Sequence, residues 1–314
     1  MRNVFIDNEL ETRFQKDGYV ELPFLAPREV EELKALFFST LPESGGQITS
    51  GDLGGNSEHE ITYDFTFIDR NHEYKRHVFE LITERFLPKM NGILDNYTPI
   101  IANFIRKKSH EGEVPLHQNW AFADEMKCST VSIWCPLVDS TKANGTLEVT
   151  PGSHKRIGKY RGPMVPWELE VIKNEIIENF MVPLETKAGD CVILDDSIVH
   201  YSAVNNTDDL RLAIQLICIP KEEKAIHYHL DHSIPNNKTI DVLEVDQEFF
   251  IQFNPWKFPD NAKKIGSVPL QFKPMSIADF NAALASPRFD ELDVHSNKTG
   301  FVSRLNRFFK RRSN

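Results

Sequence analysis

Two polar residues in an apolar, strand-like stretch are the first candidates for chemistry. His117 and Asn119 lie one residue apart within residues 115–120, so both side chains point to the same face of the expected strand. A second histidine, His200, follows a turn and an apolar strand, and Arg211 comes eleven residues later. Two histidines and a carboxylate on one face of a metal leave room for a cosubstrate and O2, which is typical of non-haem iron(II) oxygenases. Here the position of the carboxylate holds the amide of Asn119.

The residues around this pattern suggest the cosubstrate. Arg211 offers a planar, permanently charged fork that suits the distal carboxylate of 2-oxoglutarate. Ser202 shares a face with His200 if the segment stays extended, and we expect it to share that carboxylate. Asn103, on the preceding strand, is expected to reach the cosubstrate, and Trp134 is either a wall of its pocket or a packing residue.

Composition limits the remaining possibilities. The chain has 314 residues, 40% of them hydrophobic and 26% charged, which suits one large soluble domain. Its net charge of -10 argues against a nucleic-acid binder, because a surface that follows phosphates needs an excess of basic residues. No apolar run has the length of a membrane span or the form of a signal peptide, so we expect a cytoplasmic protein. The four cysteines lack paired spacing and are expected to be buried free thiols.

The pattern of the chain favours a mainly β fold with flanking helices. Residues 1–97 are expected to form a helical support and lid, including a glycine-rich loop at 44–57 and an amphipathic helix at 72–96. Short strands without alternating helices then favour an antiparallel, double-sheet jelly roll. The expected strands are residues 100–106, 115–120, 130–138, 146–150, 181–186, 190–194, 200–204 and 210–219, with a helical insert at 167–180.

The last third of the sequence has weaker patterns, and we place no domain boundary in it. Residues 221–299 are expected to wrap around the barrel, with a short capped helix at 276–285. Residues 300–314 combine apolar and basic side chains at helical spacing, which suits an acidic membrane surface or an acidic partner. Docking of this tail onto the acidic body of the protein itself is the favoured alternative.

Several spaced motifs resemble one family, the phytanoyl-CoA dioxygenase family of Fe(II)/2-oxoglutarate-dependent oxygenases. The resemblance covers roughly residues 10–220. Motifs in the right order are far more specific than any single one. They are residues 14–20 (Phe-Gln-Lys-Asp-Gly-Tyr-Val), 116–120 (Leu-His-Gln-Asn-Trp), 144–147 (Asn-Gly-Thr-Leu) and 151–155 (Pro-Gly-Ser-His-Lys), together with His200 and Arg211.

The resemblance implies a double-stranded β-helix of the cupin-like, jelly-roll type that holds Fe(II) between its sheets. It implies His117, Asn119 and His200 as metal ligands, Arg211 as the 2-oxoglutarate anchor, and O2-dependent hydroxylation of an aliphatic C–H in a small-molecule substrate. The family pattern has His-x-Asp at the first site, whereas this chain has His117-Gln-Asn119. An amide oxygen can ligate, but it is neutral and a weaker donor than a carboxylate.

Asn119 therefore leaves three alternatives open. In the first, its amide oxygen ligates iron and the enzyme works with an altered site. In the second, the barrel is catalytically inactive and acts as a small-molecule binding or sensing protein. The third follows related halogenases, in which a small residue replaces the carboxylate so that chloride can bind, although Asn is bulkier than Ala or Gly.

Other polar residues have simpler interpretations. A single histidine in an apolar strand is usually a hydrogen-bonded core residue, and only the combined spacing raises His200 above that. Asp124 and Glu125 either order the site or form a solvated turn, and we favour an ordering role. The pair His227-x-His229 is more typical of a polar loop than of a second metal site.

Overall fold

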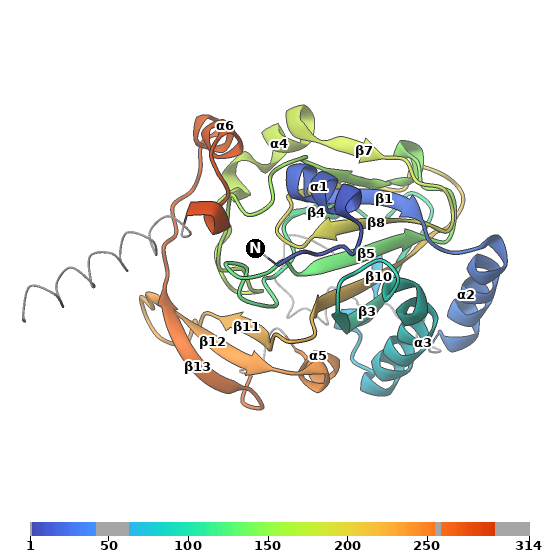
Figure 1. Cartoon of the computed structure of the whole chain (residues 1–314), viewed down its shortest axis with the longest axis horizontal. Helices are drawn as coiled ribbons and strands as arrows, with labels where there is room; N and C mark the ends of the chain where they lie inside the picture. Colours follow the sequence, from blue (N-terminus) through green and yellow to red (C-terminus); the bar gives the residue numbers. More distant parts are fainter. Residues whose placement is uncertain (1, 42–62, 255–258, 293–314) are drawn as a thin grey trace, which may run out of the picture.

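The chain forms two antiparallel sheets that face each other, as the sequence pattern predicts (Figure 1). The computed structural model describes residues 2–41, 63–254 and 259–292. One sheet has six strands in the order β1-β8-β5-β10-β3-β2, and the other has four in the order β4-β9-β6-β7. The strands are β1 (Tyr19–Pro23), β2 (Tyr63–Phe65), β3 (Tyr97–Lys107), β4 (Val114–His117), β5 (Val131–Pro136), β6 (Leu147–Val149), β7 (Val182–Leu184), β8 (Asp190–Asp195), β9 (His200–Ser202) and β10 (Arg211–Pro220).

Alternation along β10 shows how the six-stranded sheet separates two cores. Ile214 and Leu216 belong to the cluster that packs under the helices. Ala213 belongs to a second cluster shared with the four-stranded sheet, and Gln215 on the same face lines a cavity. Successive strand residues point to opposite faces, so one strand supplies both the structural core and the interior of the barrel.

Three helices cover the outer face of the six-stranded sheet, and they are α1 (Asn8–Asp17), α2 (Pro27–Thr40) and α3 (His72–Met90). The helix expected at 72–96 ends earlier than predicted, at Met90. Pro88 lies in its last turn, and because proline has no amide hydrogen, it cannot make the backbone hydrogen bond that a helical residue makes to the carbonyl four residues earlier. The following residues instead return to the N-terminal segment, where Leu94 forms a β-bridge with Phe5.

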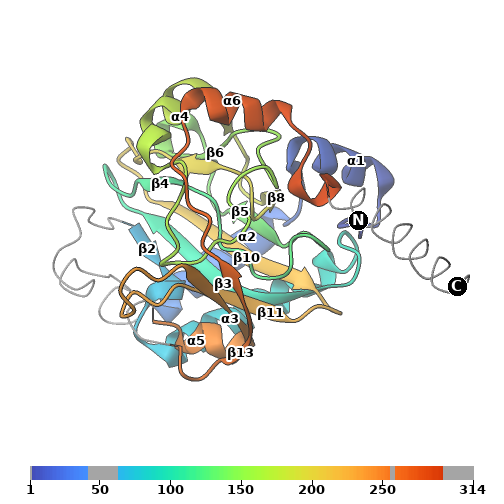
Figure 2. The same cartoon turned by 90° about the vertical axis from the view of Figure 1, so that its left-hand side faces the viewer.

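The segment after β10 carries strands that the sequence analysis missed. It forms a separate three-stranded sheet in the order β11-β12-β13 (Figure 1). Figure 2 labels its outer strands, β11 and β13. The remaining elements are β11 (Ala225–His229), β12 (Thr239–Val245), β13 (Lys263–Pro269), α4 (Lys173–Phe180), α5 (Gln247–Gln252), α6 (Ile277–Ala285) and the short helices η2 (Thr66–Ile68), η3 (Lys142–Asn144) and η4 (Glu170–Ile172). The capped helix expected at 276–285 is confirmed, because Ser276 caps α6.

Two glycines of the shared motifs permit close approaches that hold the barrel together. Gly18 ends α1 with φ 83°, and a Cβ at this position would lie 2.5 Å from Nδ1 of His154 in the 151–155 turn. Gly145 has φ 70°, and a Cβ there would lie 2.0 Å from the carbonyl oxygen of Ala203. Only glycine fits both requirements, so each motif fixes a contact between segments distant in the sequence.

Several expectations concern features at the edges of this fold. All four cysteines are free and buried, as predicted. No helix within the described ranges is long and apolar enough to cross a membrane. The glycine-rich loop at 44–57, which belongs to the expected lid, and the basic tail at 300–314 lie outside the described residues.

A buried cation on α3 gives a stability prediction. Lys75 is 3% exposed, and its Nζ has no hydrogen-bond partner among the described residues. Burial lowers its pKa from 10.5 to about 8, so the folded state is penalised while the amine is charged. The penalty is complete below pH 8 and disappears as the pH rises towards 10.5, the value of the unfolded chain. We expect Lys75→Met to stabilise the protein by up to about 3 kcal/mol at pH 7 and by much less at pH 10.5, measured by denaturant unfolding.

Candidate metal and cosubstrate site

The two candidate histidines meet across a strand pair. His117 is the last residue of β4 and His200 the first of β9, and the antiparallel register places them opposite each other. Their ring centroids lie 4.0 Å apart. Residues separated by more than eighty positions are thus brought together by one β pairing at the open end of the four-stranded sheet.

Both imidazoles present the same nitrogen to the interior. Nδ1 of His117 lies 2.7 Å from the carbonyl oxygen of Pro115, and Nδ1 of His200 lies 2.9 Å from that of Ile198. A carbonyl only accepts, so each Nδ1 carries the hydrogen and each Nε2 keeps its lone pair. Burial lowers the pKa of both imidazoles, that of His200 well below 6.5. Neutral imidazoles with a fixed tautomer are suited to binding a metal.

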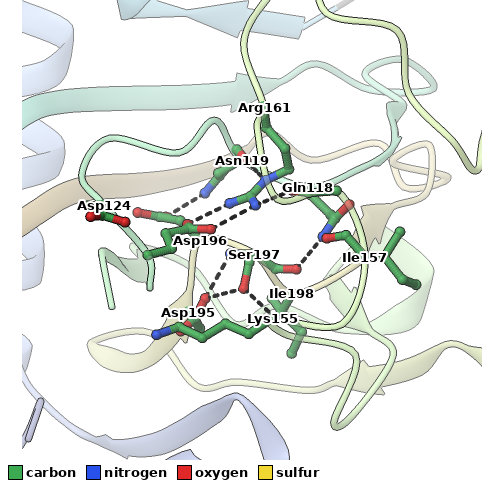
Figure 3. Close-up of polar contacts among 12 residues, drawn as sticks. Gln118, Asn119, Asp124, Lys155, Ile157, Arg161, Asp195, Asp196, Ser197 and Ile198 are labelled. Atoms are coloured by element: carbon green, nitrogen blue, oxygen red, sulfur yellow. Dashed lines mark hydrogen bonds and ion pairs between the residues drawn. The ribbon is translucent and has the colours of Figure 1, made fainter. Parts of the chain in front are cut away.

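Asn119 turns its amide oxygen towards the histidines. Its Nδ2 donates to Oδ1 of Asp196 at 2.8 Å and to Oγ of Ser132 at 3.1 Å (Figure 3). The Asn119 side chain acts to raise the pKa of His117, as an amide oxygen directed towards the imidazole does; with the hydrogen of His117 on Nδ1, that oxygen faces the lone pair of Nε2. Because the amide nitrogen is fully occupied, the oxygen is the atom available to a metal.

The donor set fits an iron ion only through this amide. Within the described residues, no group of three or more His, Cys, Asp or Glu side chains is placed to hold a metal. His117 and His200 supply two nitrogens, and Oδ1 of Asn119 supplies the third donor of a facial set. Among the residues that the structure describes, no carboxylate joins the two histidines in the position that the family pattern gives to Asp.

Arg211 forms the opposite end of the site. Its side chain is 2% exposed, and Nη2 donates to the carbonyl oxygen of Gly145 at 3.0 Å and to Oγ of Ser202 at 2.9 Å. Its Nε and Nη1 have no partner in the described part of the chain, although both are buried. The guanidinium carbon lies 5.6 Å from the ring centre of Trp134. Two unpaired donors beside a fixed cation suit a carboxylate ligand.

Ser202 holds the side chain of Arg211 in place. From the sequence, Ser202 is expected to bind the distal carboxylate of 2-oxoglutarate together with that arginine. The Ser202 hydroxyl donates to Gly145 at 2.8 Å and accepts from Arg211 and from Nζ of Lys107. A hydroxyl has one proton, and this one is already used. The ligand therefore meets the arginine, while the serine fixes the orientation of the guanidinium.

Lys107 is a buried lysine that the sequence analysis missed. It pairs with Arg211 in the β3–β10 register and is fully buried. Its Nζ donates to the carbonyl oxygen of Ser202 at 3.0 Å and also to that of Ala203. Burial and the neighbouring Arg211 lower its pKa to about 5. The amine ties β3 to the end of β9 and does not line the cavity.

All seven predicted site residues line one cavity of about 230 Å³. They are His117, Asn119, His200, Arg211, Ser202, Asn103 and Trp134. Asn103 donates from Nδ2 to Oε1 of Gln215 at 3.1 Å, and its own Oδ1 has no partner among the described residues. Much of the remaining wall is aromatic, formed by Tyr63, Phe65, Phe67, Trp120 and Phe122.

A buried ion pair supports the backbone of Asn119. Arg161 binds both carboxylate oxygens of Glu125 at 2.6 and 2.8 Å, and its Nε donates to the carbonyl oxygen of Asn119 at 2.7 Å. Figure 3 shows Arg161 beside Asn119. Glu125 therefore has the ordering role expected for it. Asp124 instead pairs with Lys127 at the surface.

The pair His227-x-His229 belongs to strand β11, so the polar loop expected for it is wrong. His227 is buried against the rings of Trp120 and Phe249, and burial lowers its pKa to about 3. The nearby His232 binds a backbone carbonyl through Nε2. These contacts make His227 a packing residue of the three-stranded sheet.

Comparisons with known proteins identify the family of this chain. The family model for phytanoyl-CoA dioxygenase matches residues 14–213. A Dictyostelium discoideum phytanoyl-CoA dioxygenase domain-containing protein 1 homolog is 27% identical over 220 residues, covering 68% of this chain and 76% of that protein. Phytanoyl-CoA dioxygenase 1 of Oryza sativa subsp. japonica is 34% identical over 122 residues, covering 35% of this chain and 40% of that protein.

Solved structures show the same fold. The α-ketoglutarate-dependent carbocyclase SnoK from nogalamycin biosynthesis aligns with a TM-score of 0.52 at 18% identity, over 70% of this chain and 86% of its own. The epimerase SnoN, solved with Fe3+, α-ketoglutarate and nogalamycin RO, aligns with a TM-score of 0.51 at 20% identity, over 69% of this chain and 84% of its own. The chain therefore belongs to the phytanoyl-CoA dioxygenase family of Fe(II)- and 2-oxoglutarate-dependent oxygenases.

Proposed function

We propose that this protein is a dioxygenase that hydroxylates an aliphatic C–H of a small molecule, with iron held by His117, Asn119 and His200. The observation that carries this proposal is the arrangement of one cavity. Two free Nε2 atoms and an amide oxygen lie at one end of it, and an arginine with two unpaired donors lies at the other. Such a cavity suits a dicarboxylate that reaches from a metal to a cation.

Iron(II) and 2-oxoglutarate, when bound, supply the oxidising chemistry of the family, in which O2 is consumed and 2-oxoglutarate becomes succinate and CO2. The chain's own residues bind and orient. Arg211 holds the distal carboxylate, Ser202 and Gly145 fix the arginine, and the two carbonyls at Pro115 and Ile198 fix the imidazoles. The aromatic wall excludes water from the reacting end.

The same wall limits the substrate class. Tyr63, Phe65, Phe67, Trp120 and Phe122 offer apolar and ring surfaces, and Arg211 is the one Arg or Lys side chain among the described cavity residues. With that cation occupied by the cosubstrate, the wall favours a substrate with an uncharged apolar or cyclic portion near the iron.

One observation favours a second candidate function, a binding or sensing barrel without turnover. The metal end of the cavity lacks a carboxylate donor among the described residues, whereas the cosubstrate end is complete. Such a protein would bind 2-oxoglutarate through Arg211 and hold iron too weakly to react.

Succinate formation separates the two functions. We expect the native protein, incubated with Fe(II), 2-oxoglutarate and air, to form succinate slowly even without its substrate. His200→Ala, which removes one Nε2 donor, is expected to reduce that rate to the background of free iron. Equal rates for the two proteins, with 2-oxoglutarate binding retained, would favour the binding barrel.

A further inference from the structure

We propose that Asp196 is the positioning residue of the metal site, which holds the Asn119 amide with its oxygen towards the iron. The inference rests on the proposed function, because it assigns Asn119 as a ligand. In this chain the ligand position, 119, carries an amide, and the carboxylate of Asp196 accepts a hydrogen bond from the nitrogen of that amide. The pair Asn119 and Asp196 then takes the place of a single ligating Asp.

The hydrogen bonds leave the amide one orientation. Oδ1 of Asp196 accepts from Nδ2 of Asn119 at 2.8 Å and from Oγ of Ser132 at 2.6 Å. Since Ser132 gives its proton to the carboxylate, its oxygen can only accept from Asn119, at 3.1 Å. A flipped amide would set its oxygen against a carboxylate and a hydroxyl lone pair. Both contacts therefore select the conformation with Oδ1 towards His117.

Asp196 is itself fixed and sheltered. Its side chain is fully buried, and its backbone amide donates to the carbonyl oxygen of Thr130 at 3.1 Å. Its second oxygen, Oδ2, has no partner in the described part of the chain. A carboxylate that accepts a hydrogen bond from the amide nitrogen pushes electron density through the amide to its oxygen. The neutral amide oxygen is then a better donor to a metal. Figure 3 shows the carboxylate directly behind the Asn119 nitrogen.

The first test needs no metal. In the metal-free native protein, we expect the side-chain amide hydrogens of Asn119 to exchange slowly with solvent, observed by NMR after selective 15N-Asn labelling. Asp196→Asn is expected to accelerate this exchange strongly. Ser132→Ala removes the longer hydrogen bond of the Asn119 amide and the hydroxyl that donates to Asp196, but it keeps the carboxylate itself, and it is expected to have a smaller effect. It also keeps the inference testable if Asp196→Asn folds poorly.

The second test exchanges the two groups. Co(II), which is stable in air and has a visible spectrum, replaces iron in an affinity titration of native protein, Asp196→Asn, Asn119→Asp and the double variant Asn119→Asp/Asp196→Asn. We expect Asp196→Asn to weaken Co(II) binding by about 10- to 100-fold, the usual effect of losing the group that orients a ligand. The double variant, with a ligating carboxylate supported by an amide, is expected to bind more tightly than native protein. Asn119→Asp alone places two carboxylates in contact and is expected to gain less than the double variant.

The outcomes separate the inference from the function on which it rests. Native exchange rates and native Co(II) affinity in Asp196→Asn would overturn the positioning role and leave the proposed function intact. A native protein with a protected Asn119 amide but no Co(II) binding would overturn the proposed function and leave the orientation of the amide standing. A double variant that binds no better than Asn119→Asp would overturn the pairing of the two groups.

Discussion

Replacing Arg211 by Met is expected to weaken 2-oxoglutarate binding by about 100-fold or more. The arginine is buried and lines the cavity, and its Nε and Nη1 have no hydrogen-bond partner among the described residues. Each charge-assisted hydrogen bond to a carboxylate contributes roughly 1.5–3 kcal/mol, and a factor of ten corresponds to about 1.4 kcal/mol. Isothermal titration of the Co(II)-loaded protein with 2-oxoglutarate measures the loss.

Two matched measurements make this result specific. Arg211→Lys keeps the charge but loses the fork, and we expect it to recover only part of the affinity. Co(II) binding alone should be unchanged in Arg211→Met, because the arginine lies at the end of the cavity away from the two imidazoles. A loss of Co(II) affinity equal to the loss of 2-oxoglutarate affinity would show that the substitution disrupts the barrel and would contradict the assigned role.

Replacing Arg161 by Met is expected to lower the free energy of unfolding by about 3–5 kcal/mol, the usual cost of breaking a buried ion pair. The substitution leaves Glu125 fully buried without its bidentate partner, and it frees the carbonyl oxygen of Asn119. Chemical denaturation followed by circular dichroism measures the change.

A surface pair with the same chemistry provides the control. Arg76 binds both oxygens of Glu248 at 2.7 and 2.9 Å, but the two side chains are 35% and 41% exposed. Arg76→Met is therefore expected to cost much less stability than Arg161→Met. Equal losses in the two variants would show that burial does not determine the contribution of the Arg161 pair.

The convergence of the candidate site residues on one cavity could be predicted because short-range rules apply to them. Strand alternation placed His117 and Asn119 on one face, and the spacing from His200 to Arg211 matched a known order of motifs. The structure brings all of these residues to one cavity. Their assignment as ligands remains a prediction until metal binding is measured.

The supporting residues could not be predicted because their roles depend on pairing between distant strands. Lys107 looks like an ordinary strand end until the β3–β10 register places it opposite Arg211. Asp196 follows Asp195 in a turn, and only the approach of β4 shows that it faces Asn119. The same limit applies to β11, β12 and β13, whose many polar residues hide the alternation that marks a strand.

The position of Asp196 next to Asn119 changes the interpretation of the Asp that is missing at position 119. In the sequence, Asn119 reads as the loss of a ligand. In the structure, a carboxyl group is still present, one hydrogen bond behind the amide. Burial raises the pKa of Asp196 to about 7. When ionised, this group places a negative charge near the metal position, although the atom that would contact the metal belongs to a neutral amide.

The central claim is that two histidines and an amide hold a working iron ion, and one titration tests it most directly. Anaerobic addition of Fe(II) and 2-oxoglutarate to the native protein should produce the visible charge-transfer absorption of a cosubstrate bound to iron through its keto acid. His200→Ala, titrated in the same way, should show none. Absence of the band in native protein, together with its appearance in Asn119→Asp, would contradict the claim and show that Asn119 prevents iron from binding productively.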